Sequence, residues 1–80
     1  MTDTTTKKPI RIQVYQDVHP FIKLPKEQVE TVTRLFESNG IKFWVDRISI
    51  SFDGTPYEST IYLRWGMNPD QVQTLLDATP

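Results

Sequence analysis

The chain has 80 residues, a formal net charge of −1, no cysteine and a single histidine. This length suits one domain with a small core, and the lack of cysteine excludes disulfides, a thiol nucleophile and cysteine-bound zinc or iron–sulfur centres. Because the net charge is close to zero, the chain as a whole would not attract nucleic acid or an anionic membrane, and such a partner would need a local basic patch.

The first nine residues are polar and contain no apolar run of the kind found in export signals. We expect residues 1–9 to form a disordered N-terminal arm and residues 10–80 to form a single α+β domain. No apolar run approaches the ~20 residues that a membrane span needs. We therefore expect a cytoplasmic protein that makes no membrane contact and needs no cofactor.

An alternation of apolar with polar or aromatic residues predicts a first strand over residues 10–16, with Ile10, Ile12 and Val14 on its core side. This strand would lie at an edge of the sheet. Its open backbone groups would then need a covering segment or a pairing partner.

Residues 17–24 are expected to form an extended connection, because Pro20 removes one hydrogen-bond donor and biases the residue before it toward an extended conformation. In this interpretation Phe21 and Leu24 tuck under the sheet. The connection is also a candidate for covering the free edge of the first strand.

A helix is predicted over residues 26–39, because the apolar residues there recur at the three- and four-residue spacing of one helical face. Those residues are Val29, Val32, Leu35 and Phe36. Pro25 falls at the N-cap, where it offers no side-chain acceptor, so Pro25→Ser should leave stability unchanged or raise it by up to ~1 kcal/mol. Gly40 is placed to adopt the left-handed conformation that ends a helix.

Two further runs of alternating hydrophobicity flank a turn signal at residues 53–56 and predict an antiparallel hairpin. The first run covers residues 41–52, and its apolar residues change from odd to even numbers between Val45 and Ile48. Since a slip of one residue turns every later side chain to the other face, we expect a bulge or bend there. The second run covers residues 61–65.

A second helix is predicted from Asn68, its N-cap, through Pro69 at its first position to about Ala78. The order β-α-β-β-α predicts an α+β fold with two helices on one face of a small antiparallel-rich sheet. A ferredoxin-like plait lacking its last strand fits this order, and a mixed three-stranded sheet in another strand order is the alternative. The residues expected to be buried are Val29, Val32, Phe36, Phe43, Ile50, Phe52, Ile61, Leu63, Val72, Leu75 and Leu76.

Asp17, His19, Asp46, Asp53 and Glu58 carry donor atoms of the kind that divalent metal sites use, but their spacing matches no known motif. Turns also favour aspartate, whose carboxylate can bond to its own backbone. His19 could act as a general base, since imidazole exchanges protons near neutral pH, yet no nucleophile is visible for it to serve. We therefore expect neither a metal site nor an enzyme.

The sheet face that points away from the helices is the strongest candidate site. The aromatic and basic residues expected on it are Tyr15, Trp44, Tyr62, Arg11, Lys42, Arg47 and Arg64. Three interpretations remain open. Such residues are simply favourable on half-exposed strands; they are enriched at protein interfaces; or they form a stacking platform for single-stranded nucleic acid, although the RRM sequence motifs are missing.

Among these interpretations we favour a small non-enzymatic protein-interaction module. It would act as a homodimer or an adaptor, with a protein partner or a second copy bound at the exposed sheet face or at a sheet edge. The residues proposed to contact the partner are Tyr15, Trp44, Tyr62, Arg11, Arg47 and Arg64. Single-stranded nucleic-acid binding on the same face is the alternative, and a metal-dependent enzyme comes third.

Overall fold

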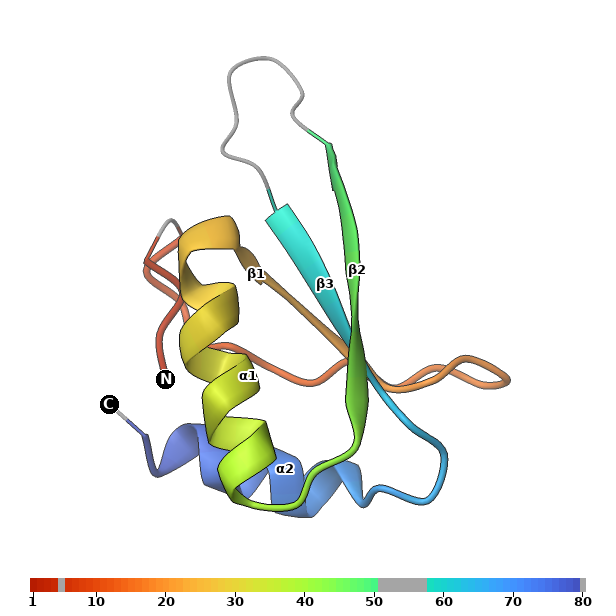
Figure 1. Cartoon of the computed structure of the whole chain (residues 1–80). Helices are drawn as coiled ribbons and strands as arrows, with labels where there is room; N and C mark the ends of the chain where they lie inside the picture. Colours follow the sequence, from red (N-terminus) through yellow and green to blue (C-terminus); the bar gives the residue numbers. More distant parts are fainter. Residues whose placement is uncertain (5, 51–57, 80) are drawn as a thin grey trace.

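A computed structural model describes residues 1–4, 6–50 and 58–79 of the chain. The helices and strands follow the order β-α-β-β-α, as predicted (Figure 1). They are β1 (Phe21–Pro25), a 3₁₀ turn (Lys26–Gln28), α1 (Val29–Ser38), β2 (Phe43–Ile50), β3 (Glu58–Leu63) and α2 (Pro69–Asp77).

The three strands form one antiparallel sheet in the order β1-β3-β2, in which β3 pairs with both neighbours. Ile22 of β1, Ile61 of β3 and Val45 of β2 lie side by side in one row across the sheet. The prediction of a small antiparallel α+β domain is therefore confirmed. Classification as a truncated ferredoxin-like plait stays a prediction.

Both helices pack on the same face of this sheet. Apolar residues from both helices and from that sheet face, together with Ile10, form one core cluster. Its buried members are Ile10, Ile22, Leu24, Val32, Phe36, Ile61, Leu63, Val72 and Leu76. Six of the residues predicted to be buried belong to this set, whereas Val29, Phe43 and Leu75 are only partly buried at its margin. Phe52 and the side chain of Ile50 lie outside the described residues.

The predicted strand over residues 10–16 is wrong, and so is the assignment of residues 17–24 as a connection. The first strand is β1, and Gln13 instead covers its outer edge through hydrogen bonds of 2.8 and 3.1 Å between the backbones of Gln13 and Phe21. The two segments have therefore exchanged roles. The covering segment reads as a strand because Ile10 is buried and Ile12 partly buried against the core, while Val14 is exposed.

Pro20 and Pro25 make the sequence of residues 21–25 unfavourable for a strand, yet both prolines are compatible with β1. Pro20 precedes β1, and its carbonyl oxygen accepts a hydrogen bond of 2.7 Å from the N–H of Leu63. Pro25 ends the strand, and the alternation of an antiparallel ladder turns its nitrogen away from β3, where no hydrogen bond is lost. Edge strands tolerate proline for this reason.

A side chain of α2 holds the covering segment in place. The Gln73 amide accepts a hydrogen bond of 2.8 Å from the N–H of Ile12 and donates one of 3.1 Å to the carbonyl oxygen of Ile10. It thus satisfies the backbone groups that a neighbouring strand would otherwise pair. Because the Gln73 amide takes the place of a neighbouring strand, residues 10–12 can remain extended without joining the sheet.

The predicted irregularity in the hairpin is confirmed. Asp46 lies opposite Thr60, but the next pair joins Ile50 to Glu58, so the register of β2 against β3 shifts between them. The turn predicted at residues 53–56 lies outside the described residues.

The local signals at the helix ends are also confirmed. Gly40 has φ = +69°, and the N–H of Ile41 bonds at 3.0 Å to the carbonyl oxygen of Phe36, as in a Schellman ending. The Asn68 side chain accepts a hydrogen bond of 2.9 Å from the N–H of Asp70 and caps α2. Pro25 occupies the N-cap of the 3₁₀ turn and makes no side-chain capping bond.

The disordered arm over residues 1–9 stays a prediction. In the conformation that the structure describes, the Gln28 side chain donates a hydrogen bond of 2.8 Å to the carbonyl oxygen of Thr2 and accepts one of 3.0 Å from the N–H of Thr4. The amino group of Met1 donates to the carbonyl oxygen of Leu76. These contacts tie the arm to the 3₁₀ turn and to α2.

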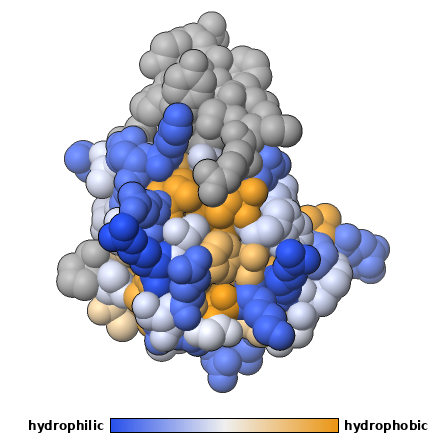
Figure 2. Space-filling view, in the orientation of Figure 1, coloured by the Kyte–Doolittle hydropathy of each residue, from blue (hydrophilic) through white to orange (hydrophobic). Residues whose placement is uncertain are grey.

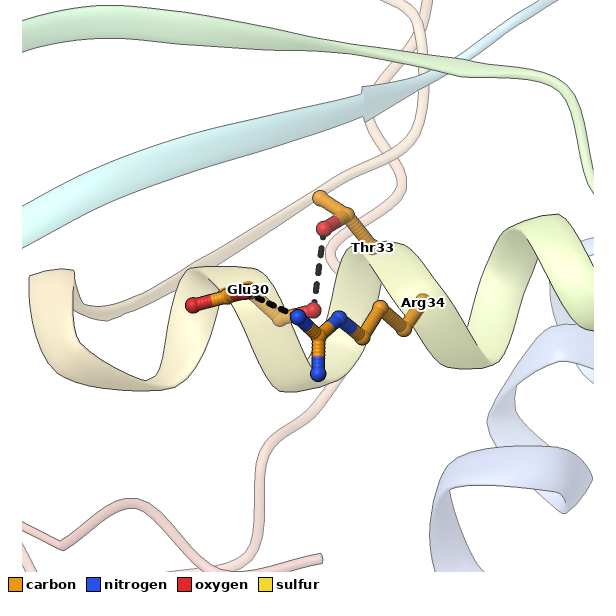
Figure 3. Close-up of polar contacts among 3 residues, drawn as sticks. All are labelled: Glu30, Thr33 and Arg34. Carbon is orange, nitrogen blue, oxygen red and sulfur yellow. Dashed lines mark hydrogen bonds and ion pairs between the residues drawn. The ribbon is translucent and has the colours of Figure 1, made fainter.

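The outer surface of α1 is polar and exposed. Arg34 forms an ion pair with Glu30 one helical turn earlier, and the Thr33 hydroxyl donates a hydrogen bond of 3.0 Å to the carbonyl oxygen of Glu30 (Figure 3). Such exposed pairs contribute little to stability. The outer side of α1 therefore differs from the opposite side of the sheet, where aromatic side chains gather.

Candidate functional site

A row of three aromatic side chains crosses the sheet on the face opposite the helices. Phe21 of β1, Tyr62 of β3 and Trp44 of β2 lie side by side in the strand register, one position along from the residues that enter the core. The ring centres of Phe21 and Tyr62 are 5.7 Å apart. Those of Tyr62 and Trp44 are 4.9 Å apart, and the two rings are stacked at 13°.

Loop residues extend this row, one at the Phe21 end and two at the Trp44 end. Tyr15, in the loop before β1, stacks on Phe21 at 5.9 Å. His19 meets the edge of Trp44 at 4.7 Å and lies 4.0 Å from Trp65, which follows β3. The result is one continuous ring cluster, called the aromatic face below, made of Tyr15, His19, Phe21, Trp44, Tyr62 and Trp65.

His19 also completes the hydrogen bonding of the sheet. Pro20 lies opposite Leu63 at the end of the β1–β3 ladder, but it has no N–H to donate to the Leu63 carbonyl oxygen. The Nδ1 atom of His19 lies 2.9 Å from that oxygen. Because a carbonyl oxygen only accepts, Nδ1 carries the proton and donates. This bond fixes the imidazole between the two tryptophans.

The margin of the aromatic face exposes large apolar side chains. Val14, Tyr15 and Val18 are 60%, 59% and 42% exposed, and Trp65 is 64% exposed. The first three belong to one loop, which projects from the side of the sheet away from the helices (Figure 1). Clustered apolar exposure of this kind marks interaction surfaces more often than scattered single residues do.

Charges of both signs surround the rings. The guanidinium carbon of Arg64 lies 5.0 Å from the ring centre of Trp44. In the neighbouring row, Lys23 of β1 and Asp46 of β2 flank Thr60 of β3. Lys42 lies opposite Arg64, so the described part of the face carries Asp46 among the cations Lys23, Lys42 and Arg64.

Four of the six residues predicted to contact a partner are brought together by the structure. They are Tyr15, Trp44, Tyr62 and Arg64. Arg11 is exposed in the covering segment, and the side chain of Arg47 lies outside the described residues.

Three members of the aromatic face were missed by the sequence interpretation. Phe21 does not tuck under the sheet, because Ile22 and Leu24 are the β1 residues that enter the core. Trp65 continues the alternation of β3 in the sequence, but the strand ends at Leu63. The sequence interpretation gives His19 only as a possible metal ligand or general base. For Trp65 the sequence offered one signal. Gly66, which has φ = +94° in the structure, ends the alternation directly after Trp65 and so marks the end of the strand nearby.

The side chains with metal-binding donor atoms singled out in the sequence are Asp17, His19, Asp46, Asp53 and Glu58. Within residues 1–4, 6–50 and 58–79, no group of three or more metal-binding side chains lies close together. Asp17 has φ = +61° and lies in the turn closed by the 3.3 Å bond from the N–H of Val18 to the carbonyl oxygen of Tyr15. Asp53 and the side chain of Glu58 lie outside the description.

Comparison with known proteins gave no match: no family model fits the chain, and no curated protein or solved structure shows significant similarity to it. No helix in the described part of the chain is long and apolar enough to cross a membrane. The functional interpretation therefore depends on the geometry of the aromatic face.

Proposed function

We propose that the protein is a small non-enzymatic protein-interaction module that binds a protein partner, another chain or a second copy, through the aromatic face. The observation that carries this proposal is the continuous ring cluster with exposed Tyr15 and Trp65 at its margin. Tryptophan, tyrosine and arginine are the residue types enriched at interface centres. The proposal includes a cytoplasmic location, because a reducing compartment suits a domain without cysteine.

The arrangement of the rings favours a protein over nucleic acid. A base stacks on an open ring face, but Trp44 already stacks on Tyr62 at 4.9 Å and has the Arg64 guanidinium 5.0 Å from its ring centre. Lys23 and Asp46 in the neighbouring row have opposite charges, which leaves Lys42 and Arg64 as the cations on this face that phosphates could contact. Ring edges and exposed loop side chains, in contrast, suit a protein surface.

Site-specific photo-crosslinking in the cells that produce the protein tests this proposal. A photoreactive residue replaces the exposed Val18 or Trp65, and matched controls replace the exposed Thr31 or Glu37 on α1. We expect protein adducts from the first two positions and none from the controls, and loss of these adducts when Trp44→Ala is added. Equal labelling from both sides of the domain would contradict the proposal, as would no labelling from either.

Single-stranded nucleic-acid binding is a second candidate, supported by the position of Arg64 over Trp44. Titration of mixed-sequence DNA and RNA oligonucleotides against tryptophan fluorescence tests it. Phosphate contacts release counterions, so true binding should weaken steeply as salt is added. No quenching at low salt would reject this candidate without affecting the first one.

A further inference from the structure

The two edges of the sheet differ in how they are covered. The outer edge of β1 is covered by Gln13, whereas β2 pairs only with β3 among the strands that the structure describes. In Figure 1, β2 runs along the side of the domain that faces the viewer. Figure 2 shows a hydrophobic strip in the middle of this same side, over β2 and its gap to α1. Phe43 and Val45 of β2 are partly buried against the core.

The alternation of the ladder identifies the backbone groups at this edge. The N–H of Arg64 bonds at 3.0 Å to the carbonyl oxygen of Lys42, so the backbone groups of Lys42 point toward β3. Antiparallel pairing alternates along a strand, and Trp44 therefore also points its backbone groups toward β3. The N–H and C=O groups of Phe43 and Val45 point outward, away from β3.

We propose that β2 pairs antiparallel with β2 of a second copy, about a two-fold axis at Trp44, an inference that rests on the proposed function. Phe43 then lies opposite Val45 of the second copy, and the outward backbone groups of both residues form hydrogen bonds. Trp44 lies opposite its own copy. Lys42 lies opposite Asp46 of the second copy, in the closely spaced pairs whose side chains approach most nearly.

The charges of Lys42, directly before β2, and of Asp46 within β2 select this register. In a two-fold antiparallel pair, opposite residues share a face, so the axis must pass through a residue. An axis at Lys42 or Asp46 would place like charges opposite each other, which is destabilising. An axis at Phe43 or Val45 would separate Lys42 from Asp46. Only the axis at Trp44 gives two opposite-charge pairs, and it joins the two aromatic faces into one row.

Charge reversal tests this pairing in sedimentation equilibrium. We expect the wild type to form dimers, and Lys42→Glu and Asp46→Lys each to weaken them at least about tenfold, because each variant places like charges opposite each other twice. An equimolar mixture of the two variants restores opposite charges at both pairs and should dimerise as the wild type does. Lys26→Glu and Glu37→Lys, matched changes at exposed sites away from β2, should have no effect.

Disulfide formation provides a second measurement that does not depend on charge. The chain contains no cysteine, so Lys42→Cys and Asp46→Cys introduce the only thiols. Under mild oxidation a mixture of these variants should form the mixed 42–46 disulfide in preference to either symmetric one, since only this pair faces across the interface. Urea unfolding of each variant confirms that it is folded.

A monomeric wild type at millimolar concentration would overturn the pairing, as would a variant mixture without rescue or without the mixed disulfide. These failures differ from failure of the proposed function. If crosslinks from Val18 and Trp65 to other proteins persist while the wild type is monomeric, the proposed interaction module is supported and the β2 pairing is refuted. If dimers respond to charge reversal but those positions give no adducts, the edge alone makes contact and the aromatic face does not.

Discussion

His19→Ala should destabilise the domain more than a change at a partly exposed loop residue usually does. His19 is half-buried and lies in a loop, but its Nδ1 donates to the carbonyl oxygen of Leu63 at 2.9 Å, in place of the missing Pro20 N–H. Leu63 is only 1% exposed. Removal of the imidazole therefore leaves a carbonyl oxygen without this donor at the end of the β1–β3 ladder.

The size of the effect follows from two contributions. A buried acceptor that loses its partner costs about 1–3 kcal/mol. The ring contacts of His19 with Trp44 at 4.7 Å and Trp65 at 4.0 Å contribute roughly 0.5–1.5 kcal/mol more. We therefore expect His19→Ala to lower the free energy of unfolding by about 2–4 kcal/mol. A chain of this length has roughly 4–12 kcal/mol in total.

Urea unfolding at neutral pH measures this loss, and two further variants separate its causes. His19→Asn keeps an N–H donor on a short side chain, whereas His19→Phe keeps the ring without the donor. Both should fall between wild type and His19→Ala. A loss below about 0.5 kcal/mol for His19→Ala would refute the reasoning, since surface changes without such partners stay within that range. If His19→Asn were as unstable as His19→Ala, the hydrogen bond to Leu63 would not be the main contribution of His19 to the free energy of unfolding.

Three further changes are tested by the same unfolding measurement. Asn68→Ala removes the acceptor for the Asp70 N–H at the start of α2 and should cost about 1 kcal/mol; no change would show that this cap is dispensable. Pro25→Ser should now destabilise by about 1–2 kcal/mol, because the Pro25 ring is fully buried and its loss outweighs a better cap; a stabilised variant would contradict this. Gly40→Ala should cost about 1–2 kcal/mol through its φ of +69° alone, since no atom beyond the adjoining residues lies within 4 Å of the added methyl. A neutral result would mean that the helix end rearranges.

The revised expectation for Pro25 shows what a cap argument from sequence omits. The sequence correctly places Pro25 at the start of a helical segment without a capping oxygen. It does not reveal that Pro25 is also the last residue of β1 and lies in the core. One residue serves both elements, and its burial depends on contacts with distant parts of the chain.

Signals that act within a few residues predicted the structure well. The spacing of Val32 and Phe36 identified the buried side of α1, and Asn68 with Pro69 identified the start of α2. The change of phase after Val45 identified the irregularity in β2. These features depend on helical periodicity, capping and strand alternation, all of which are local in the sequence.

The identity of the first strand could not be predicted in the same way. Pro20 and Pro25 are compatible with β1 only because of their positions relative to β3, and the register with β3 is set by residues some 40 positions later. Residues 10–12 remain outside the sheet while Gln73 bonds to the carbonyl oxygen of Ile10 and the N–H of Ile12. A side chain on a distant helix leaves no signal in the alternation of the segment that it holds.

The candidate site was predicted in part for the same reason. Strand alternation placed Trp44 and Tyr62 on the open face. His19 and Trp65 join them from two loops, and they meet because the His19 bond to Leu63 draws the first loop toward the end of β3. Loop residues have no period to predict their direction, so this half of the aromatic face required the structure.

The charges of β2 bear on whether its edge is protected or paired. Proteins protect open edges by covering them, with proline, or with charges that repel another strand. The edge of β1 follows this rule through Gln13 and Pro25. β2 has no proline, and the residues two positions on either side of Trp44 are Lys42 and Asp46, which have opposite signs. Two residues of like sign would repel a second copy, whereas this pair would attract one in a single register. The proposed dimer therefore explains why charge is present at this edge and also why both signs are used.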